Sequence, residues 1–269
     1  MVKENVPLSA YTTMGVGGCA RKAVFASTVA ELADAAEAGG VVLGRGSNIV
    51  AADSGYDGTV VFVRADGIRL TLDGVYAEAG ATLAALAAFC RRQGLSGLEW
   101  AAGIPGTVGG AAVMNAGAFG GDFASAVLYV DTLGGRLEKA ACGFGYRTSA
   151  IESAVLGACF AVSPDTPAAI GARIEKFAAV RRATQPQGKS AGSVFRADDL
   201  PAAVYIDRAG LKGTRVGGAL VSEKHANFIV NTGGATAADV RTLVKHIQQT
   251  VHARYGVQLI EEIRYLGDF

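Results

Sequence analysis

The spacing of apolar and polar residues in the first 65 positions predicts a small unit that alternates helix and strand. Thr28 with Glu31 three residues later forms a capping box, and apolar residues recur with a helical period after it. Two glycines at 39 and 40 end this helix, and two apolar, β-branched runs follow. The predicted elements are a helix over 29–38, strands over 41–43 and 59–63, and a loop over 44–48.

The next hundred residues predict hairpins around a single helix. Asp73-Gly74 separates two β-prone segments and is a strong signal for a two-residue turn. Thr82 is a predicted N-cap, and Gly94 ends the helix that it opens. The predicted elements are a first hairpin over 68–79, a helix over 83–93, and a second hairpin that begins at 127–132 and turns at 134–135.

The last third of the chain predicts two longer helices and a strand. Thr166-Pro167 places an N-cap before a proline at the first helical position, and Thr236 with Asp239 opens another helix. The predicted helices cover 167–183 and 237–255, and Gly256 ends the second. Residues 257–266 alternate and predict one continuous final strand, on which Glu262 shares a face with Arg264.

Charge divides the chain at the segment 164–167, which is the strongest predicted domain boundary. The whole chain has 25 Lys and Arg against 24 Asp and Glu, which argues against a general nucleic-acid binder. Residues 1–165 contain 11 basic and 15 acidic side chains, whereas residues 166–269 contain 14 and 9. The C-terminal part is therefore expected to hold an anionic ligand. We predict an α+β fold with domains at 1–65, 66–165 and 166–269.

Residues 100–121 contain no charged side chain and are long enough to span a bilayer. Seven of them are glycine, however, and Pro105 and Asn115 interrupt the run. We therefore expect a buried, glycine-rich loop system and no membrane insertion. The N-terminus lacks the apolar core of a signal peptide, and the four cysteines form no C-x-x-C pair, so we expect a reduced, cytoplasmic protein. Three scattered histidines argue against a metal site.

Two glycine clusters, at 44–48 and 103–110, suggest a nucleotide cofactor. The first lacks the third glycine of the G-x-G-x-x-G fingerprint, and Gly188-Lys189-Ser190 lacks the first glycine of a P-loop. Turns of this kind can still expose consecutive N–H groups that bind anions, although each cluster alone is more often a simple turn. Together with residues 115–117, they favour a dinucleotide. The predicted cofactor-binding residues are Gly44, Arg45, Gly46, Ser47, Asn48, Gly103, Ile104, Pro105, Gly106, Thr107, Gly109, Gly110, Asn115 and Gly117.

Further blocks extend this pattern over nearly the whole chain. They are Pro7-Leu8-Ser9 with residues 11–18, residues 43–50, Gly97-Leu98-Glu99 with residues 103–117, Tyr146-Arg147-Thr148-Ser149, residues 191–195, residues 209–213, Val221-Ser222 with His225-Ala226-Asn227, and Glu262-Ile263-Arg264. In content and order these blocks resemble the UDP-N-acetylenolpyruvoylglucosamine reductases. The short interval between Arg147 and Ser193 resembles the subclass that lacks an extra tyrosine segment.

The resemblance implies an FAD enzyme of peptidoglycan precursor synthesis, with NADPH as reductant and an enolpyruvyl UDP sugar as substrate. It also implies the FAD-binding fold of the vanillyl-alcohol oxidases, with two small α+β subdomains and a third domain over the substrate. By the same match, Arg147 and Glu262 stabilise the charge that develops on the substrate carboxylate, and Ser193 donates a proton to carbon. Glu261 is the neighbouring alternative to Glu262. No histidine lies in the glycine clusters, so we expect FAD to be non-covalent.

Further residues are predicted to contact the substrate. We assign Tyr146, Arg181 and Lys189 to substrate binding, with Arg182, Lys212, Arg215 and Lys224 as further candidates for the diphosphate. Ala197-Asp198 stands where the family often has Asn-Pro, a departure that affects one sugar or uridine contact.

Two alternatives to this interpretation differ in class. A flavin oxidoreductase with another substrate would keep the glycine clusters but lack the set Arg147, Ser193 and Glu262. A non-catalytic nucleotide-binding protein would be expected to lose catalytic residues, and all three are present. No obligate protein partner is evident from the sequence.

Overall fold

The computed structural model describes residues 1–269, which form two compact units. Unit 1 comprises residues 1–2, 23–45 and 59–181, and unit 2 comprises residues 3–22, 46–58 and 182–269. Each unit encloses a hydrophobic core of its own. The predicted functional domains at 1–65, 66–165 and 166–269 follow other boundaries, since residues 1–65 contribute to both units, and they remain a prediction.

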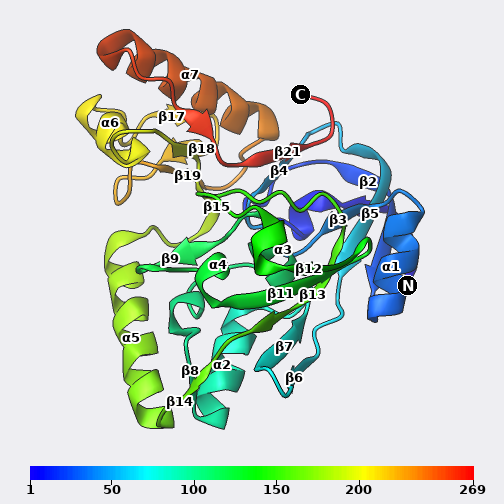
Figure 1. The fold of residues 1–269 in the computed structure, drawn as a ribbon. Coiled ribbons are helices and arrows are strands. Elements are labelled where there is room, and N and C mark those ends of the chain that lie inside the picture. Colours follow the sequence, from blue (N-terminus) through cyan, green and yellow to red (C-terminus); the bar gives the residue numbers. More distant parts are fainter. The chain divides into compact units, whose positions relative to one another are not determined.

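An antiparallel sheet of five strands, in the order β12-β11-β13-β7-β6, is the main sheet of unit 1 (Figure 1). Both predicted hairpins form, because Leu70 pairs with Val75 and Thr132 pairs with Gly135. The first one turns one residue earlier than predicted, because the N–H of Thr71 donates to the carbonyl of Gly74 at 2.8 Å. The strands are β6 (Ile68–Leu70), β7 (Val75–Glu78), β11 (Val127–Thr132), β12 (Gly135–Glu138) and β13 (Val155–Phe160). The short strands β8 (Leu95–Ser96) and β14 (Ser163–Pro164) form one pair, and β9 (Gly117–Ala118) and β10 (Gly121–Asp122) form another.

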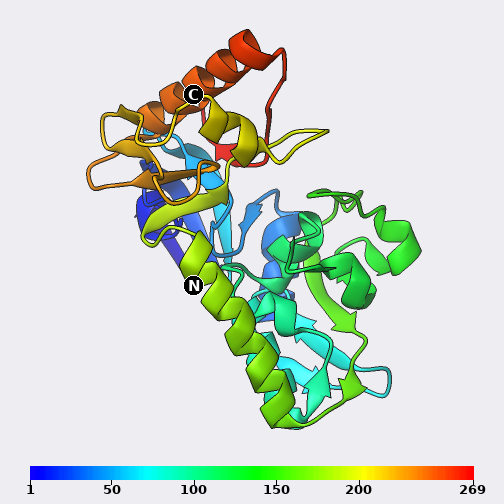
Figure 2. The same cartoon turned by 90° about the vertical axis from the view of Figure 1, so that its left-hand side faces the viewer.

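The helices of unit 1 begin at the predicted caps. Thr28 Oγ1 accepts a hydrogen bond from the N–H of Glu31 at 3.2 Å, and Thr82 Oγ1 accepts one from Ala85 at 3.0 Å. The helices are α1 (Val29–Glu37), α2 (Leu83–Gln93), α3 (Val108–Val113), α4 (Phe123–Ala126) and α5 (Pro167–Thr184), with 3₁₀ turns at Glu99–Ala101 and Lys139–Cys142. Figure 2 shows α5 as one uninterrupted helix.

A further sheet has the order β1-β2-β5-β3, and β3 and β5 within it are parallel. Its strands are β1 (Val2–Pro7), β2 (Cys19–Ala26), β3 (Val41–Leu43) and β5 (Tyr56–Val63), with a 3₁₀ turn at Leu8–Ala10. The strands predicted at 41–43 and 59–63 are therefore confirmed, and the second begins three residues earlier than predicted.

Unit 2 is built on an antiparallel sheet in the order β15-β19-β18-β17, and α7 packs against β17 and β18 (Figure 1). The predicted helix over 237–255 is confirmed as α7 (Ala237–Tyr255). Val240, Leu243, Val244, Ile247 and Val251 recur along it at helical spacing and are buried in the core. The other elements are α6 (Ala202–Arg208), β15 (Lys189–Ser193), β17 (Arg215–Val216), β18 (Ala219–Val221) and β19 (Phe228–Asn231).

The prediction of one continuous final strand over 257–266 is wrong. The segment forms two short strands, β20 (Ile260–Glu261) and β21 (Arg264–Leu266), and Glu262 lies between them. β20 pairs antiparallel with β16 (Phe195–Arg196), whereas β21 pairs parallel with β4 (Ile49–Ala51). The chain changes its partner at Glu262, so the alternating pattern does not place Glu262 and Arg264 on one face of one strand.

The uncharged stretch at 100–121 forms the end of a 3₁₀ turn, helix α3 and two very short strands. Trp100, Val108 and Ala111 from it are buried in the core of unit 1. None of the helices in the structure combines the length and the hydropathy that crossing a membrane would require.

Candidate active site

Gly44 of the first predicted glycine cluster packs closely on Thr107 of the second, and both lie in unit 1. A Cβ atom placed on Gly44 would lie 2.4 Å from Thr107 Oγ1, a distance that leaves no room for any side chain. Thr107 Oγ1 also caps α3, because it accepts a hydrogen bond from the N–H of Gly110. Gly44 therefore allows the first loop to pack directly on the start of α3.

Several N–H groups of these loops remain available to an anion. The main-chain N–H groups of Arg45, Gly46 and Ser47 donate no hydrogen bond within the chain, nor do those of Gly106 and Thr107. By contrast, the N–H of Gly109 bonds to the carbonyl of Ala79 at 2.9 Å. Gly109 and Gly110 lie within α3, and both of their N–H groups are already engaged. A Cβ on Gly109 would still lie 3.1 Å from the Cβ of Ala79, so its close packing explains the glycine there.

Gly46 packs against residues 11–13, which belong to the same unit. Its φ of +58° favours glycine, and a Cβ there would lie 2.6 Å from the carbonyl oxygen of Tyr11. The N–H of Thr13 donates to the carbonyl of Gly46 at 3.2 Å, and Thr13 Oγ1 donates to the carbonyl of Ser190 at 2.7 Å. The sequence predicted no individual role for Thr13, which lies in the block at residues 11–18. It ties the first glycine loop to strand β15.

Asn115 and Gly117, both predicted to contact the cofactor, lie against the turn that contains Arg147. Asn115 is 5% exposed, and its amide nitrogen donates to the carbonyl of Gly145 at 2.9 Å while its amide oxygen accepts from the N–H of Ala124. The Nη2 atom of Arg147 donates to the carbonyl of Gly117 at 3.0 Å. Both residues therefore hold this turn in place.

Arg147 occupies a tight turn between Gly145 and Thr148, with a φ of +57°. This left-handed conformation is unfavourable for arginine and persists because the neighbouring bonds enforce it. The guanidinium lies 4.9 Å from the centre of the Tyr146 ring, and Tyr146 itself is 67% exposed. The turn borders a cavity of about 280 Å³ that is lined by Asn115, Asp122, Ala124, Phe144, Gly145, Tyr146 and Arg147.

The main chain at Glu262 bonds to the residue after Ser193 in unit 2, although Ser193 and Glu262 are 69 positions apart in sequence. The N–H of Glu262 donates to the carbonyl of Val194, the residue after Ser193, at 2.8 Å. Ser193 ends β15 directly after Gly192, which has a φ of +77°. The hydroxyl of Ser193 makes no hydrogen bond within the chain, so it can bond to a substrate or a water molecule.

Asn48 also contacts Glu262. Its amide nitrogen donates to the main-chain carbonyl of Glu262 at 2.8 Å, and its own carbonyl accepts the N–H of Arg264 at 2.9 Å. The Asn48 side chain, which was predicted to contact the cofactor, thus fixes the main chain between β20 and β21. A pairing between residues this far apart leaves no local signal in the sequence.

The predicted substrate residues Arg181 and Lys189 belong to different units. Arg181 lies on α5 with its guanidinium 5.7 Å from the centre of the Phe119 ring, and burial lowers the pKa of this guanidinium. A Cβ on Gly103 would lie 2.9 Å from Arg181 Nε. Lys189 is exposed, and its stem lies over Gly15, where a Cβ would be 2.7 Å from the Cδ of the lysine.

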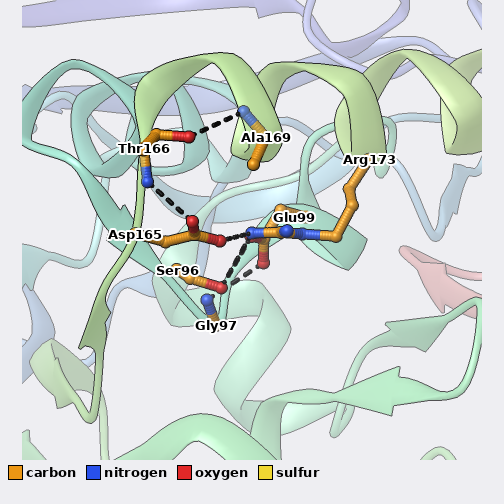
Figure 3. Close-up of polar contacts among 7 residues, drawn as sticks. All are labelled: Ser96, Gly97, Glu99, Asp165, Thr166, Ala169 and Arg173. Carbon is orange, nitrogen blue, oxygen red and sulfur yellow. Dashed lines mark hydrogen bonds and ion pairs between the residues drawn. The ribbon is translucent and has the colours of Figure 1, made fainter.

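An ion pair between the buried Glu99 and the partly exposed Arg173 joins α5 to the segment that precedes the second glycine cluster (Figure 3). Glu99, which is 7% exposed, accepts two hydrogen bonds from Arg173, at 3.1 and 2.7 Å, and one from the hydroxyl of Ser96. Arg173 also pairs with Asp165. Burial alone would raise the pKa of Glu99, but hydrogen bonds from Arg173, the Gly97 N–H and Ser96 lower it overall.

This network gives a structural role to Glu99, for which the sequence predicted none. Arg173, Phe177 and Arg181 follow one another at helical spacing on α5. Arg173 pairs with Glu99, Phe177 stacks on Phe119 at 4.7 Å, and Arg181 lies on Gly103. A lone acid beside a long uncharged stretch was the available signal, because a buried carboxylate requires a partner.

Asp198, one of the two residues that depart from the family pattern, borders a second cavity, which lies in unit 2. It has a volume of about 360 Å³ and is lined by Asp198, Asp199, Val257, Gln258 and Ile260. Asp199 accepts a hydrogen bond from the Tyr205 hydroxyl at 2.8 Å, which lowers the pKa of the carboxyl.

Two family models match the chain. Residues 20–136 match an FAD binding domain, and residues 185–266 match the C-terminal domain of UDP-N-acetylenolpyruvoylglucosamine reductase. The predicted α+β class and FAD-binding fold are thereby confirmed.

Similar proteins cover almost the whole chain. The UDP-N-acetylenolpyruvoylglucosamine reductase of Alkalilimnicola ehrlichii is 40% identical over 97% of this chain and 93% of its own length. That of Gloeobacter violaceus is 40% identical over 99% of this chain and 96% of its own length. The crystal structure of the Thermus caldophilus reductase superposes with a TM-score of 0.87 at 36% identity, covering 99% of this chain and 100% of that one.

Proposed function

The chain belongs to the UDP-N-acetylenolpyruvoylglucosamine reductases, and from this premise we propose which of its residues carry out the reaction. The enzyme uses NADPH and FAD to reduce the enolpyruvyl ether of a UDP sugar to UDP-N-acetylmuramate, in peptidoglycan precursor synthesis. Membership of this family sets aside both alternatives weighed from the sequence. Roles of single residues, contacts to the UDP sugar and NADPH, the three-domain division and cytoplasmic location remain proposals.

We assign the FAD pyrophosphate to the two glycine loops. Within unit 1, the free N–H groups of Arg45, Gly106 and Thr107 supply donors that an anion requires. The close approach of Gly44 to Thr107 supports this assignment, since a side chain at Gly44 would disturb both loops. The chemistry that bound FAD supplies is the relay of a hydride from NADPH to the enolpyruvyl carbon.

Arg147 and Glu262 are the residues proposed to stabilise the substrate carboxylate while negative charge develops on it. The fixed backbone of Arg147 supports this role, because a cation held in place before the reaction stabilises charge without reorganisation. A carboxyl group such as Glu262 repels a substrate carboxylate unless one of the two is protonated or a cation lies between them.

Ser193 is proposed to donate the proton to carbon. Its hydroxyl makes no hydrogen bond within the chain, so it is available to the substrate or to a relaying water. The observation that carries the proposal is the bond from the Glu262 N–H to the Val194 carbonyl, because it joins the main chain of Glu262 to the residue that follows Ser193.

Stopped-flow measurement of the two half-reaction rates in the Ser193→Ala variant tests this assignment. Reduction of the flavin by NADPH needs no proton on carbon and should stay within about tenfold of the wild-type rate. Reoxidation by the enolpyruvyl sugar should slow by about 10²–10⁴-fold, as expected for a lost general acid. Equal slowing of both half-reactions would show that Ser193 supports the site generally and is not the proton donor.

A further inference from the structure

The chain changes its strand partner directly after Ser193. β15 pairs with β19, but the register is irregular between Ser190 and Ser193. From Phe195 onward, the chain pairs with β20 instead. Such a change leaves main-chain N–H and carbonyl groups outside the regular ladders, and buried groups of this kind require other partners.

Asn227 supplies those partners. Its Oδ1 accepts the N–H of Phe195 at 2.9 Å, and its Nδ2 donates to the carbonyl of the same residue at 2.7 Å. The main-chain carbonyl of Asn227 accepts the N–H of Val194 at 2.9 Å. The remaining polar group, the carbonyl of Val194, accepts the N–H of Glu262. Two residues therefore satisfy every main-chain polar group of Val194 and Phe195.

The chemistry of asparagine fits this position. A carboxamide presents one acceptor and one donor side by side, which matches the N–H and carbonyl of a single residue. Asn227 is only 7% exposed, so water would not readily replace either bond. Its own main chain is fixed as well, because its N–H donates to His225 Nδ1 at 3.3 Å and β19 begins at the next residue.

We infer that Asn227 is a positioning residue for the proton transfer. By fixing the two residues after Ser193, it orients the Ser193 hydroxyl and keeps Val194 in place for its bond to Glu262. The inference rests on the proposed role of Ser193 as proton donor. A residue that merely supported the fold would affect the flavin and the substrate half-reactions alike.

Two variants and a control separate these possibilities. Asn227→Leu removes both side-chain hydrogen bonds at similar volume, whereas Asn227→Asp keeps the acceptor for the Phe195 N–H and loses the donor. The matched control is Gln248→Met, which removes a side-chain carboxamide bond to the Leu259 carbonyl in the same unit. Circular dichroism checks the fold. Hydrogen exchange at the Phe195 amide reports whether its hydrogen bond to the Asn227 side chain is lost.

The expected result is a selective defect. Both Asn227 variants should keep FAD binding and reduction by NADPH within about threefold, and should slow reoxidation by the enolpyruvyl sugar at least tenfold. Faster exchange at the Phe195 amide should accompany Asn227→Leu, and the control should leave both rates unchanged. In a Ser193→Ala background, Asn227→Leu should slow reoxidation by less than about threefold more, because positioning residues lose their effect with the group they position.

Several results would overturn the inference. They are unchanged reoxidation in folded Asn227 variants, equal slowing of both half-reactions, losses that multiply in the double variant, or failure of both variants to fold. A Ser193→Ala enzyme that reoxidises at the wild-type rate would refute the proton-donor proposal itself. Because the single Ser193 variant reveals that outcome alone, the two failures are distinguishable.

Discussion

The main-chain N–H of Glu262 bonds to the carbonyl of Val194 at 2.8 Å, although the two residues come from distant parts of the sequence. At Val194 the chain passes from β19 to β20 as its partner, and at Glu262 it passes from β16 to β4. Both proposed catalytic residues of unit 2 therefore lie where a strand changes partner. At such positions, side chains no longer follow the regular alternation of a sheet. The main chain at each position is fixed by an asparagine side chain, Asn227 near Ser193 and Asn48 at Glu262.

Gly44→Ala should weaken FAD binding by more than tenfold, or about 1.4 kcal/mol. The added Cβ would lie 2.4 Å from Thr107 Oγ1 and would push the two glycine loops apart. Fluorescence titration of the apoprotein measures the affinity. Gly134→Ala is the matched control, because its Cβ would meet no atom closer than 3.5 Å. A Gly44→Ala protein that purifies with full flavin would mean that the close approach is unrelated to the cofactor.

Glu99→Gln should lower the free energy of unfolding at pH 7 by about 2 kcal/mol, because Arg173 loses its buried anionic partner. The pKa of Glu99 is lower in the folded protein than its ordinary value of 4.5, so the ion pair stabilises the fold above that pH. The difference between wild type and variant should therefore shrink as the pH falls below about 4.5. Urea denaturation of the apoproteins at several pH values measures it, and a constant difference would contradict the account.

Arg147→Lys should impair the substrate half-reaction by about 10²-fold while leaving flavin reduction by NADPH unchanged. Lysine keeps the charge but loses the planar pair of donors, of which one already bonds to the Gly117 carbonyl. Stopped-flow absorbance of each half-reaction checks this expectation. Slower flavin reduction by the same factor would place Arg147 in the flavin site instead.

Glu262→Gln distinguishes the two open arrangements of the carboxyl group. If Glu262 is protonated, glutamine keeps a donor of the same shape, and the variant should reoxidise much faster than Glu262→Ala. If Arg147 bridges two carboxylates, the Gln variant should be as slow as the Ala variant. The ratio of the two reoxidation rates decides between these arrangements.

Local signals predicted much of the fold, because helix caps and tight turns depend on neighbouring residues. Thr28, Thr82 and Thr236 open their helices as expected, and the first hairpin forms with its turn one residue earlier than predicted. The break at Glu262 escaped prediction because it depends on strands β4 and β16, far away in sequence.

The site shows the same division between local and distant information. The glycine loops follow from composition, and the roles of Arg147, Ser193 and Glu262 follow only from family resemblance. The contacts of Asn227 with Phe195 and of Asn48 with Glu262 join residues 32 and 214 positions apart, and no local pattern announces them. Glu99 was the detectable exception, as an isolated acid beside an uncharged stretch.

The central claim is that Ser193 and Glu262 serve one step, and the most direct test is a double-mutant cycle on the rate of reoxidation by the enolpyruvyl sugar. Residues that act on one developing charge lose their effects together, so Ser193→Ala with Glu262→Ala should be at most about threefold slower than the slower single variant. Reduction by NADPH in the same proteins controls for the flavin site. Losses that multiply in the double variant would contradict the account and assign the two residues to separate steps.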